Sequence, residues 1–233
     1  MPTIVFVSPK GGAGKTTSAL ILASQLARSA KVTVIDADPN RPIATWAKGP
    51  NTPKNLTVVG DADEENIMDR IEDAAASTPF VIVDLEGTAS KIVVMAVSQA
   101  DFVIVPTQGS QLDAEQAGRA FRVIQQQEKI VRRTQPSYTL PYSVLLTRTN
   151  PAIRTRTLAH IARGLVDAGI PVFETELHER EAYKAMFSFR QPLDYLQPAD
   201  VANLDKAVAN AEAFAQEVIA TLRAHTSKEK VGS

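Results

Sequence analysis

Short runs of β-branched and aromatic residues alternate with longer helix-forming stretches along most of the chain. Each apolar run is continuous rather than alternating with polar residues, which is typical of strands covered by helices on both faces. The predicted strands are residues 4–7, 32–35, 57–59, 80–83, 102–105 and 142–146. The predicted helices are residues 15–28, 64–76, 112–133, 154–167 and 201–223. This alternation predicts a three-layer α/β fold, in which a mainly parallel, twisted sheet is flanked by helices.

The same pattern indicates one domain over residues 1–225. No linker-like stretch and no internal repeat interrupts it, and 233 residues are enough for a single large core. Residues 226–233 are polar and carry little that could pack. We therefore expect them to form a flexible tail.

Composition narrows the possible functions. The chain has no cysteine, which excludes disulfide frameworks, thiolate metal sites and thiol nucleophiles and favours a cytoplasmic protein. No basic lead-in precedes the first apolar run, and no run approaches membrane-spanning length, so we expect neither a signal peptide nor a membrane span. The formal net charge is −1. Binding to nucleic acid or to an acidic lipid surface would therefore need a local basic patch.

A glycine-rich loop follows the first predicted strand and precedes a helix-forming run. Glycines let backbone N–H groups converge on phosphate oxygens, and the positive end of the next helix acts at the same point. In such a loop Lys15 is expected to reach the β- and γ-phosphates, and the Thr16 hydroxyl to bind Mg²⁺. The expected phosphate-binding residues are Gly11, Gly12, Ala13, Gly14, Lys15, Thr16 and Thr17.

The loop departs from the usual G-x-x-x-x-G-K-[ST] pattern. Pro9 stands where the first glycine is expected, and a second lysine, Lys10, opens the loop. This arrangement resembles the deviant Walker A motif of the ParA/MinD superfamily of P-loop ATPases, and especially its small ParA-type and VirC-like members. The resemblance implies an ATP-dependent homodimer in which Lys10 reaches the nucleotide of the partner subunit.

Two aspartates follow the second predicted strand, in the segment Asp36-Ala37-Asp38-Pro39. Acids at the carboxyl end of a strand face the crevice in which doubly wound folds bind ligands. The segment resembles the D-x-D-P motif of the superfamily, although Asn40 replaces the usual glutamine. By that resemblance Asp38 positions the attacking water and Asp36 supports the Mg²⁺ shell. The expected catalytic residues are Lys10, Lys15 and Asp38.

Asp84 directly follows the predicted strand 80–83, as a Walker B acid does. A strand followed by an aspartate is weak evidence alone. It becomes stronger here because it comes after the glycine-rich loop and the D-x-D-P segment in the order that the superfamily has. The superfamily often continues with a proline-rich switch, whereas this chain reads Leu85-Glu86-Gly87-Thr88, which leaves the trigger of hydrolysis open. The expected metal ligands are Thr16, Asp36 and Asp84.

ATP is the expected nucleotide, because the chain lacks the N/T-K-x-D segment with which guanine-specific P-loop proteins bind their base. The resemblance implies that the base and ribose are lined by residues 106–107, 147–148 and 178–183, and within these ranges by Pro106, Thr147, Arg148 and Arg180. The same residues would also suit turns or helix caps. His160, His178 and His225 lack metal-ligand spacing, and Trp46 is expected to pack against a neighbouring helix.

Residues 110–170 carry nine basic and four acidic residues, a net charge of +5 in a chain of net charge −1. Arg119, Arg122, Lys129 and Arg133 fall on one face of the predicted helix. Such a face suits binding of DNA phosphates without base readout, although a solvated helix face has the same pattern. Because the superfamily binds DNA nonspecifically as an ATP-bound dimer, further candidates are Arg148, Arg154, Arg156, Lys184 and Arg190.

The resemblance thus implies an ATPase that positions DNA or another cargo. Mg-ATP would close a sandwich dimer that holds nonspecific DNA on the nucleoid, and a centromere-binding or cargo adaptor protein would stimulate hydrolysis and release. A MinD-like membrane-surface ATPase is an alternative, but its anchor would need bulky apolar residues in the tail, so no membrane partner is expected. A metabolic P-loop ligase is a second alternative, which leaves the D-x-D-P segment unexplained.

Overall fold

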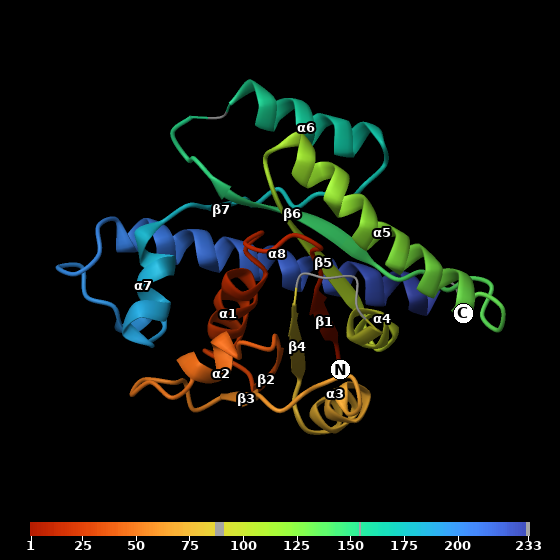
Figure 1. The fold of residues 1–233 in the computed structure, drawn as a ribbon, viewed down its shortest axis with the longest axis horizontal. Coiled ribbons are helices and arrows are strands. Elements are labelled where there is room, and N and C mark those ends of the chain that lie inside the picture. Colours follow the sequence, from red (N-terminus) through yellow and green to blue (C-terminus); the bar gives the residue numbers. More distant parts are fainter. Residues whose placement is uncertain (87–90, 154, 232–233) are drawn as a thin grey trace.

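The computed structural model describes residues 1–86, 91–153 and 155–231, with side chains at all of these except 111–116 and 228–231. Its strands form one sheet in the order β3-β2-β4-β1-β5-β6-β7, and every neighbouring pair is parallel (Figure 1). The strands are β1 (Thr3–Phe6), β2 (Val32–Ala37), β3 (Leu56–Val59), β4 (Phe80–Leu85), β5 (Phe102–Gln108), β6 (Tyr142–Thr149) and β7 (Leu177–His178).

Helices cover both faces of this sheet, which confirms the predicted three-layer α/β fold. One face packs against α1 (Lys15–Leu26), α2 (Pro42–Trp46), α7 (Glu181–Phe189) and α8 (Leu204–Val231), with the short helix η1 (Leu193–Tyr195) beside them. The other face packs against α3 (Ile67–Ser77), α4 (Lys91–Ser98), α5 (Gln111–Val131) and α6 (Arg156–Asp167).

The two cores explain why the strand sequences are continuously apolar. In β1, Ile4 and Phe6 belong to the core under α1 and α8, whereas Val5 belongs to the core under α4 and α5. All three side chains are fully buried. A strand covered on both faces gains from an apolar residue at every position, so the period-two alternation disappears.

The strand register brings the predicted acids together. Asp84 of β4 pairs in register with Asp36 of β2 on one side and with Phe6 of β1 on the other. The loop that follows Phe6 is the glycine-rich loop. Three motifs that are far apart in the sequence therefore meet at the carboxyl edge of the sheet.

The C-terminal helix is longer than predicted. Helix α8 continues to Val231 rather than ending near residue 223, so residues 226–231 are helical, and the flexibility of this tail stays a prediction. Within this stretch the Thr226 hydroxyl donates to the Leu222 carbonyl and the Ser227 hydroxyl to the Arg223 carbonyl, at 3.0 and 2.9 Å. The Lys and Glu residues that follow are good helix formers, which explains why polarity alone did not end the helix.

Trp46 anchors α2 to α7. Its indole is 1% exposed, and its Nε1 donates a hydrogen bond of 3.0 Å to the Met186 carbonyl. The expectation that Trp46 packs against a neighbouring helix is confirmed.

Candidate nucleotide-binding site

The glycine-rich loop links β1 directly to α1. Gly12 and Gly14 have φ values of 78° and 93°, in the left-handed region that favours glycine. Gly14 precedes the first residue of α1, and no side chain caps this helix N-terminus. The first N–H groups of α1 thus keep the orientation in which such helices bind phosphate.

Side chains from two neighbouring strands hold the loop. The Thr147 hydroxyl of β6 donates to the Ala13 carbonyl, and Gln108 Nε2 of β5 donates to the Gly12 carbonyl, both at 2.8 Å. A Cβ on Gly14 would lie 3.4 Å from three atoms of the Thr147 side chain. The loop is therefore fixed from the sheet side as well as by its own glycines.

Lys15 is the first residue of α1 and is buried, with 7% of its surface exposed. Its Nζ is 3.4 Å from the Lys10 carbonyl oxygen, to which it donates. Burial lowers the pKa of Lys15, while the negative charges of Asp84, Asp38 and Glu86 oppose this. Burial therefore disfavours the ammonium form more than the nearby acids favour it, and a phosphate oxygen beside Nζ would stabilise its charge.

Asp84 is fully buried, and among the described residues neither carboxylate oxygen has a hydrogen-bond partner within normal geometry. Burial raises the pKa of Asp84 to about 7, with the Thr16 hydroxyl as the largest opposing influence. The charge of Asp36 raises this pKa further. A buried carboxylate near the Thr16 hydroxyl but without a hydrogen bond of normal geometry is rare in proteins and calls for a ligand, a water or a cation.

Asp36 is also fully buried, but one of its oxygens is satisfied. Oδ2 accepts a hydrogen bond of 2.8 Å from the Ala44 N–H, whereas Oδ1 has no partner in the described residues. Burial raises the pKa of Asp36, and the Ala44 N–H is the first influence that lowers it. Asp36 therefore holds the start of α2 with one oxygen and keeps the other available.

The donor set fits Mg²⁺. Asp36, Asp84 and Thr16 offer hard oxygen ligands, and three of the carboxylate oxygens are unpartnered. In the described ranges, no three or more His, Cys, Asp or Glu side chains group together as a metal cluster. The remaining ligands would have to be phosphate oxygens and water, as is usual for Mg²⁺ bound with a nucleotide.

Asp38 lies on the loop after β2 and is half-buried. Its Oδ1 accepts hydrogen bonds from the backbone N–H of Asn40 at 2.8 Å and from Asn40 Nδ2 at 3.1 Å. Asn40, which departs from the superfamily's usual glutamine, thus orients the carboxylate of Asp38. Asp38 and Asn40 both line the phosphate side of the site.

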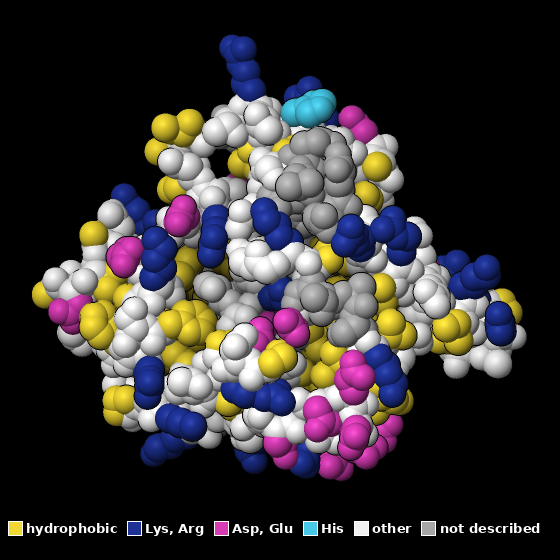
Figure 2. Space-filling model, in the orientation of Figure 1, with side chains coloured by type: hydrophobic (Ala, Val, Ile, Leu, Met, Phe, Trp, Pro, Cys, Tyr) yellow, Lys and Arg dark blue, Asp and Glu magenta, His cyan; other side chains and the backbone are white. Residues whose placement is uncertain are grey.

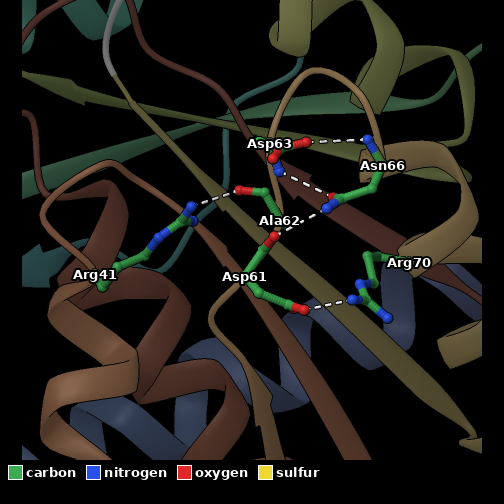
Figure 3. A network of polar contacts seen from close by, with 6 residues as sticks. All are labelled: Arg41, Asp61, Ala62, Asp63, Asn66 and Arg70. Carbon is green, nitrogen blue, oxygen red and sulfur yellow. Dashed lines mark hydrogen bonds and ion pairs between the residues drawn. The ribbon is translucent and has the colours of Figure 1, made fainter.

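Arg41 ties this loop to a second loop (Figure 3). It has a φ of 48°, and its guanidinium donates to the Asp36 carbonyl and, at 2.7 Å, to the Ala62 carbonyl. The loop of Ala62 is braced in turn by hydrogen bonds between Asn66 and its neighbours, and by an Arg70–Asp61 ion pair. The sequence did not predict a role for Arg41, because Arg41 belongs to none of the motifs and Ala62, its partner, lies 21 residues further along the chain.

Two adjoining cavities lie along the loop. The first, of about 370 Å³, is lined by the glycine-rich loop, Asp38, Asn40 and Glu86. The second, of about 270 Å³, is more apolar and is lined partly by Ile21, Tyr183 and Phe187. Gly14, Thr17 and Arg148 line both. This division matches one nucleotide, with its phosphates in the first cavity and its nucleoside in the second.

A larger cavity, of about 790 Å³, lies at the opposite edge of the sheet, beside Met1, Phe102 and Leu222. Neither the glycine-rich loop nor the buried acids line it. Chemistry, rather than size, therefore identifies the two cavities along the loop as the candidate site.

The predicted base and ribose residues have different positions. Thr147, Arg148 and Arg180 line the second cavity. Pro106 is buried within β5 and lines neither cavity. Tyr183, the last residue of the predicted segment 178–183, also lines the second cavity. Phe187 lines it too and was not predicted, although the apolar spacing of residues 181–189 could have shown a helix there.

The predicted DNA-binding residues do not form one patch on a single subunit. Arg119, Arg122 and Lys129 are exposed on α5, and Arg133 is exposed in the turn just after it. Arg156 is exposed on the neighbouring α6, and Arg148 is exposed on β6. Lys184 and Arg190 are exposed on and after α7, in the layer on the other side of the sheet. Arg154 lies outside the described residues.

Two of these residues have further contacts. The Lys184 ammonium pairs with the carboxylates of Glu179 and Glu181 at 3.5 and 3.6 Å. Arg119 lines a small recess together with Pro9 and Glu86, next to the glycine-rich loop. Figure 2 shows that acidic side chains gather over α3, away from α5, where the exposed acids are Asp61, Asp63, Glu64, Glu65, Asp69, Glu72 and Asp73.

The loop from β1 to α1, the second lysine and the buried acids of β2 and β4 define a P-loop NTPase fold of the deviant Walker A kind. A family model described as "VirC1 protein" matches residues 1–220. The chain belongs to this family, within the ParA/MinD superfamily of ATPases.

Known relatives agree with this assignment. "Protein ParA" of Rhizobium radiobacter is 37% identical over 223 residues, which are 95% of this chain and 98% of that protein. The structure of apo McdA from Cyanothece superposes with a TM-score of 0.71 at 20% identity, covering 91% of this chain and 99% of McdA. A putative plasmid partition protein of Borrelia burgdorferi bound to AMPPNP has a TM-score of 0.65 at 17% identity, with 93% and 99% covered.

Within the described part of the chain, no helix combines the length and the hydrophobicity that a membrane span requires.

Proposed function

We propose that this protein is a ParA-like ATPase that positions DNA or another large cargo. Mg-ATP closes two subunits into a sandwich dimer, the dimer holds nonspecific DNA on the nucleoid, and hydrolysis releases it. The proposal is carried by one observation: a phosphate loop with two lysines, Lys10 and Lys15, lies against two buried aspartates with unpartnered oxygens. The AMPPNP-bound structural neighbour supports ATP as the nucleotide.

In the first cavity, the α1 N-terminus and Lys15 bind the β- and γ-phosphates. Thr16, Asp36 and Asp84 would hold Mg²⁺, which when bound neutralises charge on the phosphate oxygens. Asp38 orients a water for in-line attack on the γ-phosphorus. The bond from this phosphorus to the bridging oxygen breaks, which gives ADP and phosphate.

The second lysine makes this chemistry depend on the dimer. Lys10 of each subunit reaches the triphosphate held by the other, so the charge that stabilises the transition state is complete only after closure. Closure also places the basic side chains of α5 from both subunits on one assembly. Two weak DNA sites then act together, and affinity rises through effective concentration.

A partner protein that carries the cargo is expected to stimulate hydrolysis. The resemblance to ParA-type proteins implies a plasmid or chromosomal centromere complex as cargo. The resemblance to VirC-like proteins implies a T-DNA intermediate as the alternative. Both cargoes use the same nucleotide switch.

The proposal is tested by binding of duplex DNA of random sequence with ATP, with ADP and without nucleotide. The wild type should bind tightly only with Mg-ATP, and binding should fall steeply with salt. Lys10→Ala should bind ATP as a monomer but lose ATP-dependent DNA binding. Lys31→Ala, at an exposed site between α1 and β2, is the control and should behave as the wild type. Equal DNA binding in all nucleotide states would refute the proposal.

A further inference from the structure

Two polar residues of α8 hold the segment that leads into β7. Asn210 Nδ2 donates to the Glu176 carbonyl at 2.8 Å, and Asn210 Oδ1 accepts from the His178 N–H at 3.1 Å. Two turns further along the helix, the Glu217 carboxylate accepts from the N–H groups of Glu174 and Thr175 at 2.7 and 2.8 Å. Residues seven apart share one face of a helix. One face of α8 therefore fixes the backbone of residues 174–178.

Asn210 also holds a residue of α7. The Tyr183 hydroxyl lies 3.1 Å from both Asn210 Oδ1 and the Ala207 carbonyl, either of which can accept its proton. The Tyr183 side chain is buried, and its ring lines the second cavity. Burial raises the pKa of Tyr183 far above its usual range, so the hydroxyl remains a donor at every physiological pH.

A single amide thus connects two walls of the second cavity. His178 lines this cavity from β7, and Tyr183 lines it from α7. The His178 ring is fixed from its other side, because Nδ1 lies 2.8 Å from the Thr149 hydroxyl. The Asn210 amide donates through Nδ2 and accepts through Oδ1, which are separate atoms of one side chain, so neither Asp nor Ala at position 210 can make the full set of contacts. Asn210 itself is absent from the lining of the second cavity.

We propose that Asn210 is a positioning residue for the nucleoside half of the nucleotide. By fixing His178 and Tyr183, it keeps the second cavity open at the width of a planar base, between these side chains and Ile21. It therefore sets how much the base adds to the affinity that the phosphate loop provides. This inference rests on the proposed function, since it takes the second cavity as the nucleoside site.

The test compares ATP with inorganic tripolyphosphate, which has no nucleoside. Dissociation constants for both, with Mg²⁺, are measured by calorimetry for the wild type, Asn210→Ala, Asn210→Asp and Tyr183→Phe. Asn210→Ala removes the contacts to Glu176, His178 and Tyr183. Because two walls of the second cavity then lose their support, ATP binding should weaken about tenfold, or about 1.4 kcal/mol, and tripolyphosphate binding should stay within about twofold. Asn210→Asp and Tyr183→Phe should lie between Asn210→Ala and the wild type, because each loses only part of the set.

Gln216→Ala, at an exposed site on α8, is the matched control and should change neither constant. Binding of tripolyphosphate by each variant shows that the phosphate loop is folded. An equal loss for ATP and tripolyphosphate, or no loss for either, would overturn the role of Asn210 while leaving the proposed function in place. A wild type that binds ATP no more tightly than tripolyphosphate would overturn both the role of Asn210 and the nucleoside site.

Discussion

The buried carboxylate of Asp84 should make the nucleotide-free protein less stable at neutral pH. Its pKa rises from an ordinary value of 3.8 to about 7 in the folded state. The folded protein thus holds a proton that the unfolded chain releases. Stability is lost as the pH rises from about 4 to 7 and is constant above that. At about 1.36 kcal/mol for each pKa unit, the full loss is about 4 kcal/mol.

The substitution Asp84→Asn isolates this loss, because the amide is similar in size and does not titrate. The free energy of unfolding of both proteins is measured with urea, without nucleotide and with EDTA, between pH 5 and pH 8. The difference in favour of Asp84→Asn should grow by about 2.5 kcal/mol over this range. Titrating groups that do not interact with Asp84 are common to both proteins and cancel in the difference. Asp36, Asp38 and Lys15, whose charges act on Asp84, contribute the remaining part of it.

Asp69→Asn, at an exposed site on α3, is the control and should change the free energy of unfolding by less than about 0.5 kcal/mol. If the difference between the wild type and the Asp84→Asn variant stays flat from pH 5 to pH 8, Asp84 is satisfied in the free protein. The reasoning about its unpartnered oxygens would then be wrong.

Three further predictions concern stability and are measured by urea denaturation. Arg41→Met should lower the free energy of unfolding by about 2 kcal/mol, since it leaves two backbone carbonyls without their donor; a loss as small as that of an exposed arginine would contradict the bracing role. Gly49→Ala should lower the free energy of unfolding by more than about 3 kcal/mol, because the new Cβ would lie 1.9 Å from the Arg190 carbonyl oxygen. The control is Gly118→Ala in α5, whose new Cβ meets nothing within 4 Å and should stabilise the protein by up to about 1 kcal/mol. Similar effects at both sites would refute this prediction. Trp46→Phe should cost about 1–3 kcal/mol, because the Met186 carbonyl loses a buried donor, and a neutral effect would show that water replaces the indole.

The sequence predicted the sheet well because each of its longer strands is covered on both faces. The continuous apolar runs at 80–83 and 102–105 are local signals, and the structure has them as β4 and β5. The shorter elements α2, α4, α7 and β7 were missed. β7 spans two residues and forms only because β6 and α8 hold it in place. A pattern of a few residues cannot distinguish such an element from a loop.

The candidate site divides in the same way. Residues of the phosphate loop and the acids could be predicted as candidates because their spacing along the chain indicates the chemistry. Arg41 and Asn210 could not, since their contacts join segments more than 20 residues apart. In the sequence, Asn210 is simply one polar residue on a long amphipathic helix. Only the packing of α8 against β7 shows that its amide bonds to the backbone of Glu176 and His178.

The strand order has a consequence for synthesis of the chain. β1 begins at Thr3, yet the described residues pair it only with β4 and β5, which begin at Phe80 and Phe102. A nascent chain that has emerged as far as α3 has its phosphate loop attached to a strand with no neighbour on either side. The phosphate loop cannot become rigid before about the first half of the protein has left the ribosome. A stalled or truncated fragment that ends before β4 should therefore not bind nucleotide.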